Sequence, residues 1–234
     1  MDPMRPGLKK WPESSWQRLL EEALKIEERL PDRLPFSFGG GTALAVHLGH
    51  RISYDIDLFY KSVDAFDYYH PNKNAAVDAL VKKYSGSWQF PGNYLKLELG
   101  MGEIDILVST FMTQSPVEDW VFKKWAIKIE KPAEILAKKI CYRSSQFKRR
   151  DIFDMAIMCH LKENDVDIAL EANHESLARL RDRISTMESD YEKFVLVDIN
   201  PTRIGRKFVK NGPDICISAI DKFLLARGGR AGGF

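Results

Sequence analysis

Two aspartates, separated by one residue, are the clearest chemical signal in the sequence. Asp55 and Asp57 lie in the segment Tyr54–Tyr60, whose other residues are apolar or aromatic. Because successive side chains of a β-strand point to opposite faces, a strand over this segment would place both carboxylates on one face. Adjacent carboxylates repel each other unless a positive charge lies near them, and a divalent metal ion commonly supplies that charge. The spacing therefore predicts two ligands for a hard cation such as Mg²⁺.

A third carboxylate on a neighbouring strand would complete such a site. Asp105 is the natural candidate, because Glu103–Val108 alternates charged and apolar residues as a half-buried strand does. Glu103 would share the face of Asp105 and is a second candidate. Protein-bound Mg²⁺ is usually held by a few carboxylates together with substrate phosphates and water. Two such ions can clamp the attacking and leaving oxygens when a phosphoryl group is displaced in line.

A glycine-rich turn, Gly39–Gly41, precedes the paired aspartates. Thr42 can cap a helix that continues to Leu48. Backbone N–H groups at the start of a helix bind phosphate, and glycine leaves no Cβ in the way. Gly40, Gly41 and Thr42 are therefore candidate phosphate-binding residues. Each of these features alone is common, but the succession of strand, glycine turn, short helix and Asp-x-Asp strand is much more specific.

This succession closely resembles the signature of AbiEii-type nucleotidyltransferase toxins, members of the DNA polymerase β-like nucleotidyltransferase superfamily. The resemblance lies in Gly40–Leu44 and His47–Phe59, and it continues in Glu134–Arg143 and Arg150–Asp154. It covers roughly residues 36–160. The downstream part looks like a later motif of the family, in which a Lys and an Arg on one helix precede Arg-Asp-x-x-Asp.

The resemblance implies a transferase that moves an NMP from an NTP to an acceptor hydroxyl and releases pyrophosphate. Asp55, Asp57 and Asp105 would hold Mg²⁺ or Mn²⁺, and Asp105 could also act as a base. Nucleotide phosphates would be bound by the residues Gly40, Gly41, Thr42, Lys139, Arg143 and Arg150. The family also implies the toxin of a bacterial toxin–antitoxin or phage-defence pair, with the cognate antitoxin encoded nearby.

Elementary geometry agrees with the downstream motif. Lys139 and Arg143 are four residues apart, so they would share one helix face and could reach a triphosphate together. Asp151 follows Arg150 and could be either a helix cap or a catalytic acid. Asp154, one turn later, could orient a base or a hydroxyl, so we count it with Lys139 among the candidate catalytic residues.

Three neighbouring residues have simpler interpretations. Lys138 is adjacent to the candidate lysine but points about 100° away from it, which predicts a surface position. His47 lies on the apolar side of its helix, which favours a packing role. Arg51 belongs to the signature and lies near the acids in the sequence, which suggests that it pairs with a carboxylate.

The acceptor stays open at this stage. An RNA such as tRNA, or a protein, is plausible by family analogy. Residues 201–234 contain seven Lys and Arg against two Asp, which would suit a polyanion, although a solvated basic surface explains them equally well. A small-molecule acceptor, as in antibiotic nucleotidyltransferases, is a second interpretation. A nucleotide-binding regulatory module without turnover is a third.

Composition limits the class of protein. The chain has 234 residues, 44% hydrophobic and 29% charged, with a net charge of +2. These are ordinary values for a globular protein. Its three cysteines are widely spaced and form no CxxC pair, so neither a disulfide framework nor a zinc site is expected. No apolar run resembles a signal peptide or approaches the roughly 18 residues that span a bilayer, so we expect a cytoplasmic protein with no membrane partner.

The predicted fold class is α+β. A mixed sheet flanked by helices, of the nucleotidyltransferase type, is expected over residues 1–130, and a mostly helical domain over 131–234. Strands are predicted at 36–38, 54–60, 88–90, 94–99 and 103–109. Helices are predicted at 13–30, 42–48, 64–84, 132–144, 151–161, 174–188 and 214–226.

Overall fold

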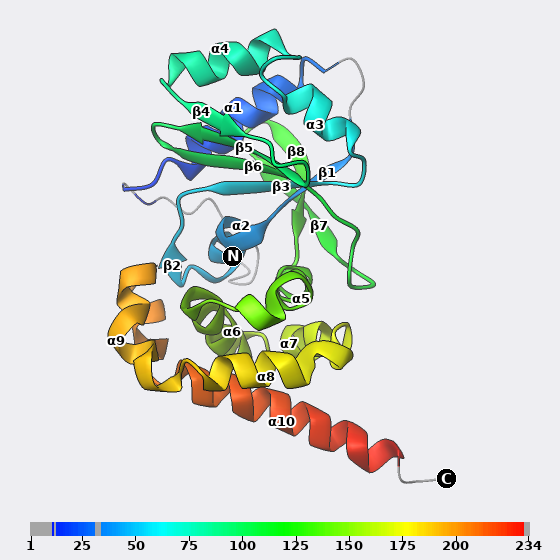
Figure 1. Ribbon diagram of the computed structural model, residues 1–234, viewed down its shortest axis with the longest axis vertical. Coiled ribbons are helices and arrows are strands. Elements are labelled where there is room, and N and C mark those ends of the chain that lie inside the picture. The colour runs from blue at the N-terminus through cyan, green and yellow to red at the C-terminus, as the bar shows by residue number, and fades with distance from the viewer. Residues whose placement is uncertain (1–10, 12, 31–33, 232–234) are drawn as a thin grey trace. The chain divides into compact units, whose positions relative to one another are not determined.

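Seven strands of the described chain form one mixed sheet in the computed structural model, which describes residues 11, 13–30 and 34–231 (Figure 1). The strands are β1 (Phe36–Gly39), β3 (Ile56–Tyr60), β4 (Ser87–Gln89), β5 (Tyr94–Leu99), β6 (Gly102–Val108), β7 (Val117–Phe122) and β8 (Trp125–Glu130). Their order across the sheet is β4-β5-β6-β3-β1-β8-β7. The pairs β3–β6 and β1–β8 are parallel, and the other neighbours are antiparallel.

Helices cover the two faces of this sheet unequally. One face carries α1 (Trp16–Glu27), α3 (Asp64–Tyr69) and α4 (Ala75–Lys83), and the other carries α2 (Gly40–Leu48) (Figure 1). The Tyr60 hydroxyl of β3 donates a hydrogen bond to Glu27 of α1. Because strand side chains alternate, Asp57 of β3 projects from the opposite face, the one that carries α2.

The core of the sheet forms around α1, whose apolar residues recur at helical spacing. Trp16 is fully buried, with its ring centroid 6.1 Å from that of Phe38 and 5.9 Å from that of Phe122. Leu19, Leu20, Ala23 and Leu24 are buried on the same helix. The apolar stripe of α1 thus joins β1 and β7, which are far apart in the sequence.

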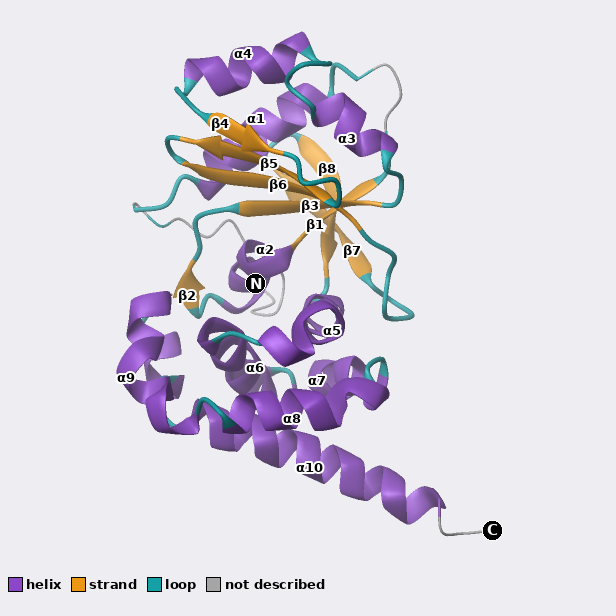
Figure 2. Cartoon of the chain, in the orientation of Figure 1, coloured by secondary structure: helices purple, strands orange, loops and turns teal. Residues whose placement is uncertain are grey.

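The chain after Lys131 is mostly helical (Figure 2). Its α-helices are α5 (Pro132–Arg143), α6 (Arg149–Leu161), α7 (Glu163–Glu171), α8 (Leu177–Ser185), α9 (Glu188–Asp198) and α10 (Gly212–Ala231). Short 3₁₀ turns, η1 (Ser144–Gln146), η2 (His174–Ser176) and η3 (Gly205–Phe208), lie between them. α6 is central, because every residue from Asp151 to Met158 is buried. No helix in the described ranges has the length and apolar character that a membrane crossing requires.

The described chain forms two compact units. One comprises the described residues up to Leu48 together with Ile52–Phe111 and Val117–Lys131. The other comprises Gly49–Arg51, Met112–Pro116 and the described residues from Pro132 onward. Short strands β2 (Arg51–Ile52) and β9 (Asn200–Pro201) form a separate two-stranded sheet. The domain boundary predicted at residue 130 stays a prediction.

The predicted fold class, a mixed sheet with flanking helices followed by a mostly helical part, is confirmed. Several predicted elements differ in detail. The single helix predicted over residues 64–84 is wrong, because Pro71 cannot continue a helix and Asn74 caps a new one by accepting N–H groups of Ala76 and Val77. Likewise, the helix predicted over 174–188 is a 3₁₀ turn followed by α8.

The sequence patterns did not predict α7, α9, the short strands β2 and β9, or the hairpin of β7 and β8. The hairpin turns at Lys123, whose φ is 53°. A lysine in this left-handed region gives no signal of the kind that Asn-Gly provides. The strand predicted over 54–60 also begins later, at Ile56, which leaves Asp55 outside the regular ladder.

We expect Trp16→Ala to lower the free energy of unfolding by about 3–5 kcal/mol, because a large buried ring would leave a cavity. Chemical denaturation followed by circular dichroism measures this. Val121→Ala, on a strand residue that is 65% exposed, is the control and should change stability by less than about 1 kcal/mol. An equal loss in the two variants would contradict the packing of Trp16 against Phe38 and Phe122.

Candidate active site

Four neighbouring strands place one residue each at the same level of the sheet. Gly39 of β1 pairs with Asp57 of β3, Asp57 with Asp105 of β6, and Asp105 with Lys96 of β5. Residues directly opposite each other on paired strands project from the same face. The sheet therefore sets two carboxylates side by side, with a lysine next to them, although Asp57 and Asp105 are 48 positions apart in the sequence.

Asp55 lies just before this level. Its Oδ1 accepts a hydrogen bond from the backbone N–H of Glu103 at 3.0 Å. This contact ties the residue before β3 to the beginning of β6. The three predicted acids are thus gathered at one end of β3 and β6, with Asp57 and Asp105 as direct neighbours.

The electrostatics of Asp105 reflect this crowding. The pKa of Asp105 is raised to about 7, first by burial and then by the charge of Asp57, while Lys96 opposes both. The Lys96 Nζ lies 3.4 Å from Asp105 Oδ1 and also pairs with Glu103. Asp105 Oδ1 is buried and has no hydrogen-bond partner among the described residues. One carboxylate oxygen is thus available for a further ligand.

Gly40 is packed directly against Asp57. Its φ is +65°, in the region that favours glycine, and a Cβ built on it would lie 2.0 Å from Asp57 Oδ2. Any other residue would force the Asp57 side chain to shift and would strain the backbone. Glycine here therefore allows the start of α2 to approach the carboxylate closely.

Thr42 does not cap the helix as predicted, because α2 begins two residues earlier, at Gly40. Its side chain is buried instead. The hydroxyl lies 2.7 Å from the Ser53 hydroxyl and donates a hydrogen bond to the backbone carbonyl of Asp55. Thr42 therefore fixes the loop that carries Asp55, and only its backbone N–H is left to meet a phosphate.

The residues suit a hard cation in their chemistry. Within the described residues, no group of three or more His, Cys, Asp or Glu side chains is arranged to hold a metal ion by itself. Mg²⁺, however, is often bound by one or two carboxylates and completes its shell with water and substrate phosphates. The neighbouring carboxylates of Asp57 and Asp105 fit that mode, since Asp105 Oδ1 has an ion-pair contact with Lys96 but no hydrogen-bond partner among the described residues.

The second unit contains a cluster of buried ionic side chains. Asp154 is at its centre and is fully buried. Its carboxylate accepts hydrogen bonds from Arg51 Nε at 2.8 Å and Lys139 Nζ at 2.7 Å. His50 Nε2 lies 2.7 Å from the same carboxylate. We call His50, Arg51, Lys139, Asp151 and Asp154 the buried ionic cluster.

Opposite charges keep these acids ionised. Burial alone would raise the pKa of Asp154, but Arg51, Lys139 and His50 outweigh it and hold this pKa well below its usual range. The pKa of Asp151 is lowered in the same way, since Lys139 and Arg143 outweigh its burial. Burial lowers the pKa of His50, which favours the neutral ring.

Lys139 and Arg143 share one helix face, since both approach Asp151. Lys139 Nζ lies 2.6 Å from Asp151 Oδ1 and Arg143 Nη1 lies 3.6 Å from Oδ2. Lys139 is almost fully buried, whereas the Arg143 side chain is 32% exposed. Asp151 is not the N-cap residue, because α6 begins at Arg149, but its Oδ2 accepts the N–H of Lys148.

Two further predictions on this helix and its neighbours have clear outcomes. The surface position predicted for Lys138 is wrong: the residue is 4% exposed and lies 3.7 Å from Glu134. All of α5 from Pro132 to Ile140 is buried, so a rotation of 100° does not reach solvent. The carboxylate partner predicted for Arg51 is confirmed, and it is Asp154. Arg150 is exposed in the first turn of α6.

Sequence reasoning missed two residues of these sites. Lys96 stands on the polar face of an alternating strand, which indicates exposure but not a carboxylate neighbour. His50 is next to Arg51 in the signature, yet only the contact with Asp154 shows its position. In both cases the partner is distant in the sequence, so no local pattern identifies it.

Comparison with known proteins identifies the chain as a nucleotidyltransferase and specifies its family. A family model described as "Nucleotidyl transferase AbiEii toxin, Type IV TA system" matches residues 23–202. The chain belongs to this AbiEii family. No curated protein was found to match the sequence.

Solved structures of two proteins are similar to the chain at low identity. A solution structure of the antibiotic-resistance factor ANT(2'')-Ia is 16% identical, with a TM-score of 0.49, and the match covers 73% of this chain and 97% of that chain. A crystal structure of ANT(2")-Ia in complex with adenylyl-2"-tobramycin is 17% identical, with a TM-score of 0.48, and the match covers 68% of this chain and 97% of that chain. The crystal structure of an antigenic nucleotidyltransferase-like protein from Paracoccidioides brasiliensis is 16% identical, with a TM-score of 0.41, and the match covers 76% of this chain and 94% of that chain.

We expect Gly40→Ala to destabilise the protein and to displace the Asp57 carboxylate, because its Cβ would overlap that group. Gly92→Ala is a matched control, since Gly92 also has a positive φ but a Cβ there would meet nothing within 4 Å. Backbone strain costs about 1–2 kcal/mol in either variant. Thermal denaturation should show a clearly larger loss for Gly40→Ala, and equal losses would contradict the close approach.

Asp154→Asn should lower the free energy of unfolding by about 3–5 kcal/mol at neutral pH, because Arg51 and Lys139 would stay buried without their counter-charge. The folded-state pKa of Asp154 is depressed. Its contribution is therefore complete above the unfolded pKa, about 3.9, and is lost as the pH falls through the lower folded value. The difference in stability between wild type and variant should accordingly shrink below about pH 4.

The control for this experiment is Asp221→Asn in the same unit. Asp221 accepts two hydrogen bonds from Arg181, at 2.7 and 3.0 Å, but both side chains are about 40% exposed. Solvent screening should limit its effect to less than about 1 kcal/mol. Denaturation of the three proteins between pH 3 and pH 7 compares them, and a similar loss in both variants would refute the importance of burial.

Proposed function

We propose that the protein transfers an NMP from an NTP to the hydroxyl group of an acceptor and releases pyrophosphate. The observation that carries this proposal is the shared level of Asp57 and Asp105 in the sheet, with the start of α2 packed against Asp57 at Gly40. Membership of a nucleotidyltransferase family supports the same chemistry. Carboxylates next to a helix start supply what a metal-bound triphosphate needs.

Asp55, Asp57 and Asp105 are the proposed ligands of Mg²⁺ or Mn²⁺. A bound ion would neutralise these carboxylates and the charge that develops on the phosphates. The ion pair of Lys96 with Asp105 supports the proposal, because it indicates that these carboxylates attract positive charge. Asp105 is also the proposed base, since it is a partly buried carboxylate beside the proposed phosphate site.

The backbone N–H groups of Gly40, Gly41 and Thr42 are proposed to bind phosphate. They belong to the first turn of α2, where N–H groups point out of the beginning of the helix. The helix dipole adds favourable partial charge at the same end. Because Gly40 and Gly41 carry no side chains, phosphate oxygens could approach the backbone closely.

Lys139, Arg143 and Arg150 are proposed to provide positive charge to the nucleotide phosphates. Arg143 and Arg150 would do so by direct contact, because their side chains are at least partly exposed. Lys139 would act from a position fixed by Asp151 and Asp154. For Asp154 we propose a positioning role, since its buried carboxylate is already surrounded by donors.

An RNA such as tRNA, or a protein, is the proposed acceptor. The AbiEii family is described as the toxin of a type IV toxin–antitoxin system, which supports a cognate antitoxin as partner. A role in phage defence is a further part of the proposal. We propose that the protein acts in the cytoplasm, where NTPs and RNA are present.

The test is transfer of label from each radiolabelled NTP, in the presence of Mg²⁺, to total RNA and total protein. Asp57→Ala and Asp105→Asn should each reduce transfer by at least about 100-fold, because several kcal/mol of transition-state stabilisation would be lost. Chelation with EDTA should abolish transfer by the wild type. The control is Asp119→Asn on β7, whose side chain is 88% exposed; it should keep wild-type activity.

The fold of the variants is checked separately by thermal denaturation without metal. Asp57→Ala should melt at or above the temperature of the wild type, because it relieves repulsion with Asp105. Undiminished transfer by Asp57→Ala would refute the metal site. Absence of transfer by the wild type, together with stabilisation by NTP, would indicate a binding module instead.

A further inference from the structure

A cavity of about 470 Å³ opens on the second unit, at the beginning of α6 and the ends of α8 and α9. Its lining includes Lys148, Arg149, Arg150, Arg183, Thr186 and Asp198. We call it the basic cavity, because four of the described lining residues are cationic and one is acidic. The proposed reaction assigns only Arg150 a role, and the other residues have none so far.

The positive charges in the basic cavity are close enough to affect each other. The charge of Arg150 is the largest cause that lowers the pKa of Lys148, followed by burial and by Arg143. Like charges gathered at one place raise the free energy of the protein. An anion bound in the cavity would relieve that repulsion.

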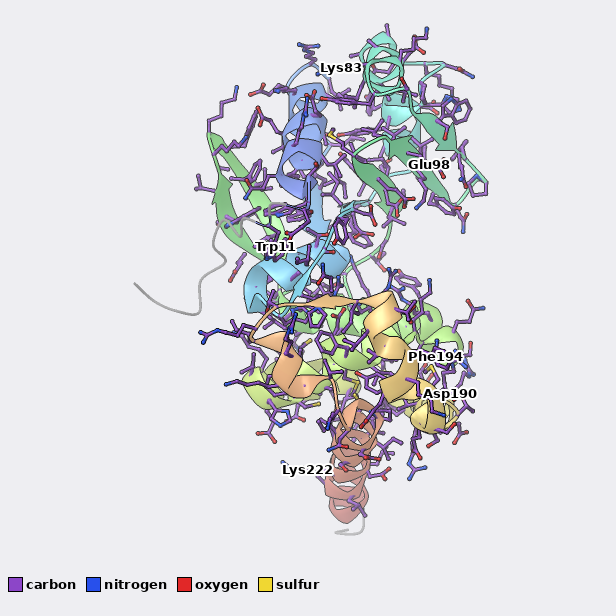
Figure 3. All side chains as sticks on the ribbon, turned by 90° about the vertical axis from the view of Figure 1, so that its left-hand side faces the viewer. Trp11, Lys83, Glu98, Asp190, Phe194 and Lys222 are labelled. Atoms are coloured by element: carbon purple, nitrogen blue, oxygen red, sulfur yellow. The ribbon has the colours of Figure 1, made fainter. Side chains whose placement is uncertain are left out.

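Arg149 provides a second, independent observation. Its Nε is buried and has no hydrogen-bond partner among the described residues. The guanidinium lies 5.2 Å from the ring centroid of Phe194, which Figure 3 labels on α9, and Nη1 is 3.8 Å from Asp198 Oδ2. A buried N–H without an acceptor is costly, so this donor is suited to an oxygen ligand that the protein does not itself supply.

Arg183 is held in place at the same cavity. Its Nε donates to the backbone carbonyl of Phe147 at 3.1 Å and its Nη1 to Thr186 Oγ1 at 3.4 Å. These contacts fix the guanidinium beside the chain that leads into α6. The N-terminus of this 13-residue helix adds partial positive charge.

We propose that the basic cavity is a phosphate-binding site, in which Lys148, Arg149 and Arg183 join Arg150 around phosphate oxygens. Guanidinium groups suit this ligand because their N–H donors match the spacing of phosphate oxygens. The proposal concerns phosphate binding alone, so it can hold whether or not the protein carries out the proposed transfer reaction. Its phosphate comes either from a nucleic-acid strand or from a free polyphosphate, and these two sources are distinguished below.

Asp198 makes the proposal testable in both directions. It is the one acid among the described lining residues, and it competes with a ligand for Arg149. Removing cations from the cavity should weaken phosphate binding, and removing this acid should strengthen it. A variant that is merely unstable would not bind phosphate more tightly. Tighter binding after removal of Asp198 therefore cannot be explained by a damaged fold.

The experiment measures binding of the full chain to a 12-nucleotide single-stranded RNA by fluorescence anisotropy, and to inorganic pyrophosphate by calorimetry. Whichever of the two probes the wild type binds, the double variant Lys148→Gln/Arg149→Gln should bind it at least about 10-fold more weakly. Its binding should also depend less steeply on salt concentration. Asp198→Asn should bind it more tightly than wild type. Arg150 is left unchanged because it belongs to the proposed nucleotide-binding set.

The control is Lys82→Gln/Lys83→Gln, which removes the same charge from two adjacent exposed residues of α4, outside the basic cavity and outside residues 201–234. It should bind within about twofold of wild type. If the cavity variants change binding of RNA alone, the phosphate ligand is that of a nucleic-acid strand. If they change binding of pyrophosphate, the ligand is a free polyphosphate. Failure of the wild type to bind either probe, or equal weakening by both double variants, would overturn the proposal.

Discussion

Repulsion between two neighbouring carboxylates is the constraint around which the candidate active site is arranged. The parallel pairing of β3 with β6 places Asp57 and Asp105 directly opposite each other on one face of the sheet. A protein tolerates such a pair only if charge nearby compensates for it or if one proton stays bound. Lys96 supplies part of that compensation from the next strand, and the raised pKa of Asp105 reflects the rest.

The buried ionic cluster solves the same problem in another way. Arg51, Lys139 and His50 surround Asp154, so its charge is balanced within hydrogen-bond distance and its pKa falls. Burial of ions is expensive, and this cost is met only because each polar atom of the carboxylate has a donor. Lys139 is therefore held in one position. An exposed lysine, with its long flexible side chain, would not be held in this way.

The two arrangements explain why similar residues differ in role. Asp105 keeps a buried oxygen without a hydrogen-bond partner in the described chain and suits a ligand, whereas Asp154 has its oxygens occupied and suits a structural task. Arg149 resembles Asp105 in this respect, since its Nε also lacks a partner there. Unsatisfied buried groups are rare in folded proteins, and these two atoms lie where we propose that ligands bind.

Local patterns in the sequence were enough to predict many features of this protein. The Asp-x-Asp spacing, the glycine turn and the Lys139/Arg143 face are local patterns, and local geometry is what strand alternation and helix periodicity encode. The family resemblance rested on the same residues and was correct. The broad fold class also followed, because hydrophobic periodicity changes from strand-like to helical near residue 130.

Which residues meet depends on tertiary packing. It placed Lys96 beside Asp105, His50 and Arg51 on Asp154, and Lys138 in the interior, where the sequence predicted a surface lysine. It also moved the start of α2 to Gly40, so that Thr42 holds the Asp55 loop in place of capping the helix. The physical reason is common to all of these: strand register and helix packing join segments far apart in the chain, and no local pattern records those pairings.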